Sequence, residues 1–520
     1  MKKNICWVFL ILLLFSLKSF AQEFSAFTFN ELVSLSASLN QPKPLLDKID
    51  MVLNTPVVDN SINPNEVFQP KVSNKIGPYI RVSTWNIDRG FDINRIKYVF
   101  VAPDKLLKNV NEKIQKDPKN IERIKEQINI LKNTDVLFLN EVDLGMPRTN
   151  YKDIAKELAK TTGYNYAYGI EFIEVDPSYL GTGKNNWSEK KSLQKDNPTQ
   201  KVFKLDKKRY KGFHGNAILS KFPLQNVRII RLPLAYNWYS NEKEKITKLE
   251  EAKRTLSEKM FEEYMLTEVR LGSRMALIAD INIPEFDQKI TLVCIHIENR
   301  TRPENRAKQI KYLLDQLKHI DNPIILTGDF NTTMVDGSST SIQKELKNKI
   351  KDPHFIAKTA LLYGNPYGFA INATSEFCNF VRLSTNPASR SIPVFASNPE
   401  RKTFNVIKDF KFNDGHYFDT RGDKDKSIDG KSGFLANSNE KRLKGFVPTF
   451  IFKKDYGLLK YKLDWIFVKD YVKNSADSND PYKFAPHFGR TLFDLNFALN
   501  EPLSDHAPIT VDLPLTEYKK

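Results

Sequence analysis

The strongest constraint on the fold is a series of short apolar runs, each followed or interrupted by Asn, Glu, Asp or His. Runs that are rich in aliphatic and aromatic residues and bounded by polar ones are typical of buried strands. We therefore predict strands at residues 80–85, 135–139, 217–219, 275–283, 289–297, 323–326, 462–468 and 509–513.

Helical patterns lie between some of these predicted strands. Thr301 and Glu304 have the spacing of a capping box, and Pro303 suits a first helical turn. One apolar helical face then follows, formed by Ala307, Ile310, Leu313, Leu314 and Leu317. Helices are also predicted near 30–39 and 44–53, whereas the Asn- and Pro-rich stretch 57–78 is predicted to be loop. This mixture indicates sheets covered by helices, an α/β (α+β) sandwich.

The first 21 residues have the pattern of a secretory signal peptide. Lys2 and Lys3 form a basic start, residues 5–15 are apolar, and cleavage is predicted after Ala21. The alternative is a membrane anchor, but the apolar run is short for spanning a bilayer. No later stretch is apolar enough to span one, so we expect a secreted or periplasmic protein without stable membrane insertion.

Two cysteines remain after this predicted cleavage, because Cys6 lies in the signal peptide. Cys294 sits in a strand-like run and is predicted to be a buried free thiol. Export permits a disulfide between Cys294 and Cys378. Whether these two cysteines pair is left open by the sequence.

The chain is basic, with a formal net charge of +17, of which the signal peptide supplies three lysines and no acid, leaving about +14. A basic balance favours anionic partners, namely nucleic acid, phospholipid surfaces or phosphorylated small molecules. A generally lysine-rich proteome would give the same composition. The expected partner is a phosphoester substrate, with nucleic acid as one candidate, and the protein is expected to be a monomer.

Three long polar segments are predicted to be insertions in one large domain. We expect a signal peptide at 1–21, a lead-in at 22–77 and the domain at 78–515, with insertions near 176–211, 241–263 and 336–454. Long loops in compact enzymes are often functional. The first insertion is rich in lysine, and the third separates two groups of candidate site residues.

The polar residues at the predicted strand ends are of the types that bind metals and phosphate. They are Asn86, Asn140, Glu141, Asp143, His214, Asn216, His296, Asp329, Asn331, Asp464, Asp505 and His506. Side chains at strand ends can converge at one edge of a sheet sandwich, where oxygen-rich clusters suit hard metal ions. Taken one at a time, each motif is weak evidence, because a turn, a loop cap or a buried core histidine is its usual explanation.

In its order along the chain, the whole set resembles the endonuclease/exonuclease/phosphatase superfamily, which has the DNase I-like fold. The matching motifs are Trp85-Asn86-Ile87, Asn140-Glu141-Val142-Asp143, Gly215-Asn216-Ala217-Ile218-Leu219-Ser220, His296, Gly328-Asp329-Phe330-Asn331, Leu463-Asp464-Trp465-Ile466 and Ser504-Asp505-His506-Ala507-Pro508. The resemblance covers roughly residues 80–513 and implies a four-layer sandwich of two mixed β-sheets flanked by helices. The lead-in and residues 141–149 look like a branch of secreted bacterial members.

The resemblance implies roles for the acidic and amide residues. Glu141 would be the main ligand of Mg²⁺ or Mn²⁺, helped by Asn86 and Asp505. Asp329 would align or deprotonate the attacking water, and Asn331 would hold that water or the phosphate. A divalent ion at such a site neutralises charge on a phosphoryl oxygen.

The resemblance also implies roles for the histidines. His506 would donate to the scissile phosphate, and Asp464 would orient its ring, since a carboxylate fixes the tautomer of an imidazole. His296 matches a second family histidine that contacts the phosphate or leaving group, and Asn216 would support it. His214 belongs to the site or to the surface. Arg274, near a predicted strand, would bind substrate phosphate or have a structural role.

The predicted function is hydrolysis of phosphate esters by metal-assisted water attack, as a phosphodiesterase or nuclease. The alternatives are sphingomyelinase-like activity, inositol-phosphate phosphatase activity, or a non-catalytic binding protein on the same fold. The aromatic stretch 236–239 is interpreted as local packing or as an exposed tip for lipid or bases. The basic stretch 190–211 favours polyanions, but a shared fold gives a reaction type rather than a substrate.

Overall fold

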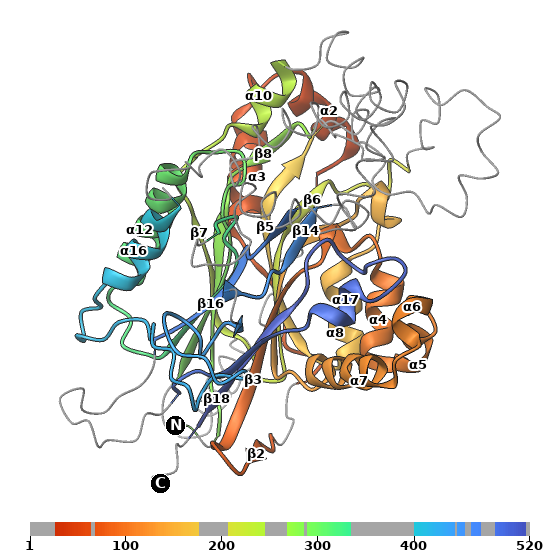
Figure 1. The fold of residues 1–520 in the computed structure, drawn as a ribbon. Helices are drawn as coiled ribbons and strands as arrows, with labels where there is room; N and C mark the ends of the chain where they lie inside the picture. The colour runs from red at the N-terminus through yellow and green to blue at the C-terminus, as the bar shows by residue number, and fades with distance from the viewer. Residues whose placement is uncertain are drawn as a thin grey trace, which may run out of the picture.

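The computed structural model describes residues 27–63, 68–175, 206–244, 268–284, 286, 289–333, 400–442, 445–452, 459–469 and 484–515. Two large sheets lie face to face in this part of the chain, with helices on the outer side of each (Figure 1). This arrangement confirms the expected four-layer sandwich. The predicted signal peptide, most of the lysine-rich stretch 190–211 and residues 334–399 lie outside the described residues.

The larger sheet carries the N-terminal and C-terminal strands of the domain. Its order is β1-β5-β6-β4-β3-β18-β17, with β2 paired to β3 and β8 paired to β5. The strands are β1 (Val57–Asp59), β2 (Lys71–Ser73), β3 (Gly77–Asn86), β4 (Val136–Leu144), β5 (Asn165–Glu174), β6 (Phe213–Ser220), β8 (Arg270–Gly272), β17 (His487–Thr491) and β18 (Ile509–Pro514). Because β3 and β4 are parallel and β18 is antiparallel to β3, the sheet is mixed.

The smaller sheet has the order β16-β11-β10-β9-β7. Its strands are β7 (Gln225–Arg231), β9 (Met275–Ile281), β10 (Ile290–His296), β11 (Ile324–Asp329) and β16 (Asp464–Lys469). Here β10 and β11 are parallel and their neighbours are antiparallel, so this sheet is also mixed. Two short ribbons lie apart from it, β12 (Lys441–Arg442) with β13 (Gly445–Phe446), and β14 (Phe450–Phe452) with β15 (Leu459–Tyr461).

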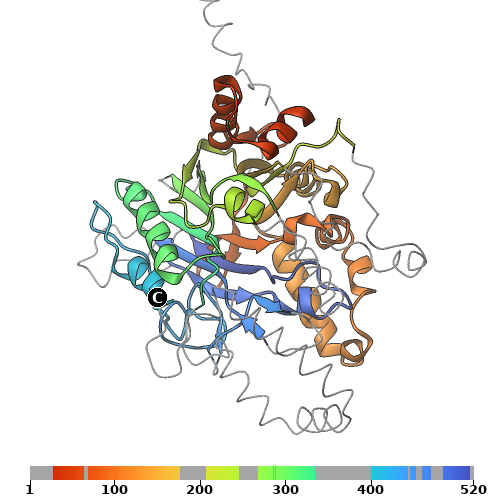
Figure 2. The ribbon, with the colours of Figure 1, turned by 90° about the horizontal axis from the view of Figure 1, so that it is seen from above.

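Helices cover the outer face of both sheets. Figure 2 shows α12 (Pro303–Leu317) and α16 (Arg401–Asp409) on one side, and α4 (Ile93–Val101), α7 (Pro118–Lys132) and α8 (Ile154–Thr162) on the other. The other described helices are α2 (Phe29–Ala37), α3 (Lys43–Asn54), α5 (Pro103–Leu107), α6 (Glu112–Gln115), α10 (Trp238–Glu244) and α17 (Phe493–Phe497), with the 3-10 turns η1 (Asp88–Gly90) and η2 (Pro147–Thr149). None of the helices in the described ranges is both long and apolar enough to cross a membrane.

The central strands are apolar throughout because both of their faces are buried. In β4, Phe138 points into the core between the two sheets, whereas Leu137 and Leu139 point into the core under α4, α7 and α8. In β10, Leu292 lies in the core between the sheets and Val293 in the core under α12. Side chains of a strand alternate between its faces, so a strand between two cores loses the usual alternation of apolar and polar residues.

All eight predicted strands are present, but the prediction of a loop at 57–78 was wrong. That stretch contains β1, which pairs with β5, and β2, which pairs with β3. These strands were missed because each has only three residues and lies at the sheet's edge, where few apolar residues are required. The longer strand β5 was also not predicted, although all ten of its residues are buried.

The helix predicted after Thr301 is present as α12, and its apolar face is buried. The predicted capping box is wrong. The N-cap residue is Arg302, no side chain caps the helix, and Thr301 Oγ1 instead accepts a hydrogen bond from Asn305 Nδ2 at 2.9 Å. With Pro303 as the first helical residue, the first turn lacks one amide that would otherwise need a cap.

The described end of the long predicted insertion is packed against the smaller sheet. Phe404 and Ile407 of α16 are buried in the core under α12, and the Phe404 ring lies 4.8 Å from the Trp465 ring. Cys294 is buried in β10, as predicted, and is unpaired within the described ranges. Cys378 lies outside those ranges.

Candidate active site

The ends of parallel strands bring the predicted site residues together. Asn86 pairs with Asn140 at the last paired position of β3 and β4, and His296 pairs with Asp329 where β10 and β11 end. Asp464, the first residue of β16, lies opposite Asp329. Because parallel strands end at the same edge of a sheet, residues separated by more than a hundred positions meet at one edge of the sandwich.

Asn140 links the two sheets at this edge. Its Oδ1 accepts a hydrogen bond from the Asp329 backbone N–H at 2.9 Å, and its Nδ2 donates to Ile295 O at 2.8 Å. Gly328, just before Asp329, has φ +140°, and an added Cβ would lie 1.9 Å from Ile295 O, so the close approach requires glycine. Sequence analysis quoted Asn140 within a motif but assigned it no role.

Glu141 occupies a β-bulge. The pairing of β4 with β6 shifts between Leu139 and Val142, and Glu141 has φ +52°. A bulge turns a side chain away from the regular alternation of the strand, and here it directs a carboxylate to the site. Burial alone would raise the pKa of Glu141, but the nearby cations, Arg89 first among them, hold that pKa well below its usual range.

The Asn86 amide lies between two carboxylates. Its Nδ2 is 3.3 Å from Glu141 Oε1 and 3.1 Å from Asp329 Oδ2. Its Oδ1 accepts a hydrogen bond from the Asp88 backbone N–H at 3.1 Å. In this arrangement Asn86 positions both carboxylates, and binding a cation through Oδ1 requires the amide to rotate.

Asp329 is the point on which the site converges. Its Oδ2 lies 3.6 Å from His296 Nε2 and 3.8 Å from His506 Nε2, and its Oδ1 accepts the Asn331 backbone N–H at 2.8 Å. Asn331 is half-buried, and its Nδ2 donates to Ile297 O at 3.0 Å. Burial, together with the Asp464 charge, raises the pKa of Asp329 above its usual range.

His506 and Asp464 form a buried pair. His506 Nδ1 is 2.8 Å from Asp464 Oδ2. Burial opposes the charged imidazolium, but the carboxylates of Asp464, Asp505 and Asp329 outweigh it and raise the pKa of His506 well above its ordinary value. The ring of half-buried Phe450 lies 4.9 Å from the His506 ring. Asp505, also half-buried, accepts a hydrogen bond from Ser504 Oγ at 3.3 Å.

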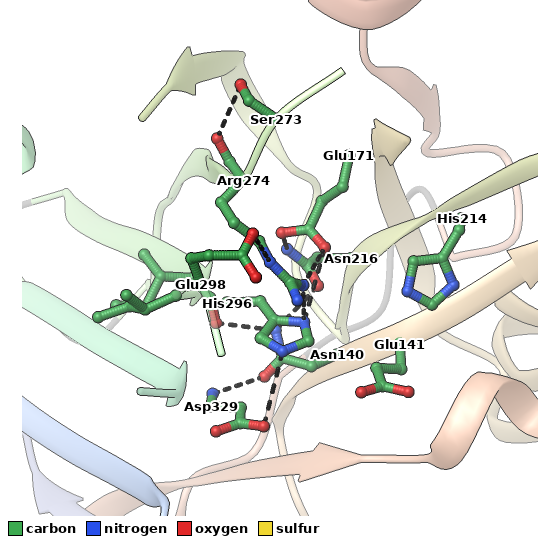
Figure 3. A network of polar contacts seen from close by, with 12 residues as sticks. Asn140, Glu141, Glu171, His214, Asn216, Ser273, Arg274, His296, Glu298 and Asp329 are labelled. Atoms are coloured by element: carbon green, nitrogen blue, oxygen red, sulfur yellow. Dashed lines mark hydrogen bonds and ion pairs between the residues drawn. The ribbon is translucent and has the colours of Figure 1, made fainter. Parts of the chain in front are cut away.

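On the other side of Asp329, His296 is held by Arg274 (Figure 3). Arg274 NH1 lies 2.7 Å from His296 Nδ1 and donates to Glu171 Oε2 at 3.0 Å. Because a guanidinium can only donate, Nδ1 accepts and the ring proton lies on Nε2. That Nε2 is buried, has no hydrogen-bond partner in the described part of the chain, and faces Asp329.

Glu171 and Asn216 support this arrangement from the larger sheet. The Asn216 amide is fully engaged, with Nδ2 donating to Glu171 Oε1 at 3.1 Å and Oδ1 accepting from Asn140 at 2.9 Å. Asn216 therefore contacts the site through those two residues. Arg274 is likewise buried among protein groups. Burial would raise the pKa of Glu171, but nearby cations, Arg274 first among them, lower it to about 2.

Sequence analysis missed Glu171 altogether. It lies in a second bulge, where the pairing of β5 with β6 shifts between Ile170 and Phe172. The available signal was the presence of two acidic residues, Glu171 and Glu174, inside the largely apolar run 164–175. An unpaired carboxylate is too costly to bury in a strand, so this pattern indicates a buried cationic partner.

His214 belongs to a second buried cluster beside Glu141. Its Nδ1 lies 2.9 Å from Asp143 Oδ1, and Arg148 donates to Asp143 Oδ2 at 2.6 Å and to Oδ1 at 2.9 Å. Burial lowers the pKa of His214. Arg148 also contacts Glu174 at 2.7 Å and Glu268 at 3.1 Å. Arg148 and the two glutamates were not recognised in the sequence.

The aromatic stretch 236–239 packs locally, as one of the two interpretations held. Trp238 is 4% exposed, and its Nε1 donates to Glu298 Oε2 at 2.9 Å. The Arg270 guanidinium stacks 4.0 Å from the centre of the Trp238 ring. These contacts stabilise the segment that precedes β9 and carries Arg274.

Two groups of residues have the chemistry to hold a cation. Ligand atoms of Asp329, Asp464 and His506 lie within 4.8 Å of one another. The predicted group is Glu141, Asn86 and Asp505, and its oxygen donors suit a hard divalent ion. Since Asp464 and His506 already bind each other at 2.8 Å, we favour the predicted group. Glu141 of this group also shares the neutral Asn86 amide with the Asp329 carboxylate, and a cation at Glu141 would offset the repulsion between these two charges.

Comparisons with known proteins give one family match and several similar solved structures. A profile described as the Endonuclease/Exonuclease/phosphatase family matches residues 83–506. Among solved structures, the human Nocturnin catalytic domain has TM-score 0.36 and 16% identity, covering 84% of this chain and 93% of its own. The 3′-5′ exonuclease NExo from Neisseria meningitidis has TM-score 0.37 and 14% identity, covering 84% and 99%. A search of curated proteins finds no match.

Proposed function

We propose that this chain, which belongs to the endonuclease/exonuclease/phosphatase family, is an exported, metal-dependent phosphodiesterase. Family members hydrolyse phosphoester bonds. The observation that carries the proposal is the environment of Asp329, whose carboxylate lies within 3.8 Å of two histidine Nε2 atoms and accepts a hydrogen bond from Asn86. A carboxylate surrounded by ring N–H groups is arranged to activate water beside a bound phosphate.

In this proposal Asp329 takes the proton of the attacking water. Burial raises the pKa of Asp329, which makes the carboxylate a stronger base than an exposed aspartate. The Asn331 backbone N–H and the Asn140 side chain fix its position. One contact comes from β4 of the larger sheet and the other from the residues directly after β11, so the base is held from two sides.

The two histidines would stabilise the phosphoryl group. His506, kept protonated by Asp464, donates from Nε2, and His296 donates from the Nε2 proton that its contact with Arg274 leaves in place. Both Nε2 atoms face the same carboxylate, and therefore the same place where a phosphate would bind. Donors held in position before the reaction stabilise the charge that develops on phosphoryl oxygens.

Glu141, Asp505 and a rotated Asn86 would hold Mg²⁺ or Mn²⁺. A divalent ion bound there would neutralise charge on a phosphoryl oxygen. The low pKa of Glu141 keeps its carboxylate charged for this role. Asp88 and Asn86 are the first residues that would move on binding, because the Asp88 N–H occupies Asn86 Oδ1.

The substrate class we favour is an extended phosphodiester such as nucleic acid. The support is the net charge of +17 and the lysine-rich stretch that leads into β6, the strand of His214 and Asn216. A basic surface binds a polyanion through several phosphates at once. Export by residues 1–21 would place the enzyme in the periplasm or outside the cell.

A hydrolysis panel with Mg²⁺ or Mn²⁺ tests this function. The substrates are plasmid DNA, RNA, sphingomyelin, inositol phosphates and bis-p-nitrophenyl phosphate, each measured with wild type and with Asp329→Asn. We expect hydrolysis of nucleic acid and of bis-p-nitrophenyl phosphate, abolished in the variant. Activity confined to sphingomyelin or inositol phosphates would move the protein to another substrate class, and no hydrolysis of any substrate would favour the binding-protein alternative.

A further inference from the structure

The pair formed by Asp143 and His214 takes no part in the mechanism above, yet it is built into the edge of the site. Asp143 of β4 lies opposite His214 of β6 in the register of the two strands. Their side chains meet at 2.9 Å through Nδ1, and both are buried. The orientation of the His214 ring is therefore set by this hydrogen bond and by the burial around it.

The carboxylate of this pair is itself held from behind. Arg148 contacts both oxygens of Asp143 through Nε and NH2, at 2.6 Å and 2.9 Å. Its NH2 also contacts Glu174, and its NH1 contacts Glu174 and Glu268. A carboxylate in such a bidentate ion pair is charged and only accepts hydrogen bonds. His214 Nδ1 therefore donates to Asp143, and the ring's lone pair lies on Nε2.

The local backbone directs this ring toward the predicted cation ligand. Glu141 sits in the bulge next to the Asp143–His214 pair, and Figure 3 shows the His214 ring directed toward the Glu141 carboxylate. Within the described residues, His214 makes its one hydrogen bond through Nδ1. A ring that donates from one nitrogen to a carboxylate and presents the other beside an acidic ligand has the arrangement of a metal-binding histidine.

We propose that His214 Nε2 is a nitrogen ligand of the cation that Glu141 binds, in an Asp143–His214–metal triad. This inference rests on the proposed function, since it assumes a cation at Glu141. An imidazole ligand favours Mn²⁺ and later transition ions over Mg²⁺, which prefers oxygen. The ratio of Mn²⁺ affinity to Mg²⁺ affinity would then be larger at this site than at a site with oxygen ligands alone.

Pulsed electron paramagnetic resonance of the Mn²⁺-loaded full chain tests the proposal directly, because nitrogen bound to Mn²⁺ modulates the spin echo. We expect ¹⁴N coupling in wild type, its disappearance in His214→Gln, and its retention in His506→Gln. His319→Gln, at an exposed histidine, is the matched control and should also retain it. Calorimetry should show that His214→Gln lowers Mn²⁺ affinity about tenfold or more while Mg²⁺ affinity changes little.

The outcomes separate this inference from the proposed function. If Mn²⁺ binds but shows no nitrogen coupling, His214 is not a ligand, and the proposed cation site at Glu141 still stands. Coupling that disappears in His506→Gln instead places the ion at Asp329, Asp464 and His506 and also overturns it. Absence of Mn²⁺ and Mg²⁺ binding overturns both. If His214→Gln does not fold, wild type, His296→Gln and His506→Gln decide the question, because coupling that survives both variants leaves His214 as the site's remaining nitrogen ligand.

Discussion

At the scale of single residues, buried carboxyl groups of the site have pKa values shifted in opposite directions, because their charged neighbours differ. Glu141 and Glu171 lie among arginines and histidines, which hold their pKa values low against the effect of burial. Burial, together with the charge of Asp464, raises the pKa of Asp329. Pairs of groups whose pKa values are pushed apart indicate different roles. Here the low pKa values indicate that Glu141 and Glu171 stay charged, as a cation ligand or in a structural role. The raised pKa indicates that Asp329 is the candidate base.

Replacing the candidate base or the phosphate donor should stop turnover without unfolding the protein. Asp329→Asn and His506→Ala are each expected to lower kcat by about 10²–10⁴-fold, the usual contribution of a general acid or base. Initial rates on bis-p-nitrophenyl phosphate, with circular dichroism melts, check this. Asp315→Asn, on the exposed face of α12, is the matched control. Wild-type turnover by either site variant would rule out the mechanism.

Asp464→Asn should reduce activity less than His506→Ala, and the two reductions should not add. Asp464 acts through the His506 ring, which it contacts at 2.8 Å, so its effect disappears once the ring is gone. The double variant should therefore be as slow as His506→Ala alone. Reductions that multiply would show that Asp464 has an independent role.

Glu171 should contribute stability that depends on pH. Its pKa is lowered from 4.5 to about 2 in the folded chain, so its contribution is complete above pH 4.5 and is lost as the pH falls toward 2. The shift corresponds to ~3 kcal/mol. Urea unfolding of wild type and Glu171→Gln should differ most at pH 7 and less at pH 3. An equal difference at both pH values would show that the charge of Glu171 is not the cause.

At the scale of secondary structure, the site depends on two bulges and one glycine. The bulges in β4 and β5 lie on both sides of β6 and turn Glu141 and Glu171 out of the regular alternation. Gly328 lets β11 approach β10 closely enough for Asn140 to hold Asp329. The strands thus fix carboxylates that a loop would leave mobile.

The helix α16 should be a stabilising part of the domain, although it lies within the stretch predicted to be an insertion. Phe404 is 1% exposed and packs against Trp465 of β16. Phe404→Ala should lower the free energy of unfolding by about 3–5 kcal/mol. Urea titration measures this, with Lys402→Ala on the exposed face as control. A change below ~0.5 kcal/mol would show that α16 is dispensable.

At the scale of the whole molecule, one acidic edge lies in a chain of net charge +17. The buried carboxylates of the site need a cation, whereas the overall charge attracts anions. In the function we propose, the basic charge would draw in a phosphate polymer, and a cation bound at this edge would offset the local repulsion between carboxylates and phosphate.

Activity should require a divalent ion. Excess chelator is expected to abolish hydrolysis, and added Mg²⁺ or Mn²⁺ should restore it, because Glu141 and Asp505 hold charge that a cation offsets. The ion should also raise the melting temperature of wild type, since a ligand that binds only the folded state stabilises it. Full activity in excess chelator would contradict the metal requirement.

The lysine-rich stretch 190–211 should affect polymers more than small substrates. Replacing Lys190, Lys191, Lys195 and Lys201 with glutamine should raise KM for nucleic acid and leave KM for bis-p-nitrophenyl phosphate unchanged. The salt dependence should weaken by roughly 0.7–0.9 log units per log salt for each phosphate that the variant no longer neutralises. If both KM values and the salt dependence are unchanged, lipids and small phosphoesters are as well supported as nucleic acid as substrates.

The sequence by itself determined the family, the order of the motifs and the strands that carry them. Those features are local: an apolar run that ends in Asn86, Asp329 or His506 is visible in a short stretch of chain. Because polar residues at strand ends can converge at one edge of a sandwich, these residues were expected to meet, and they do where the pairing of β3 with β4 and that of β10 with β11 stop.

The tertiary structure alone decided which buried charges pair. Glu171 meets Arg274 across 103 positions, and Asn140 reaches Asp329 across 189. A bulge shifts the register by one residue, which reverses the face of every following side chain, and no periodicity in β5 reveals that shift. The partners of Glu171, Arg148 and His214 are therefore set by strand register and by the spacing of the two sheets, which depend on the packing of the whole domain.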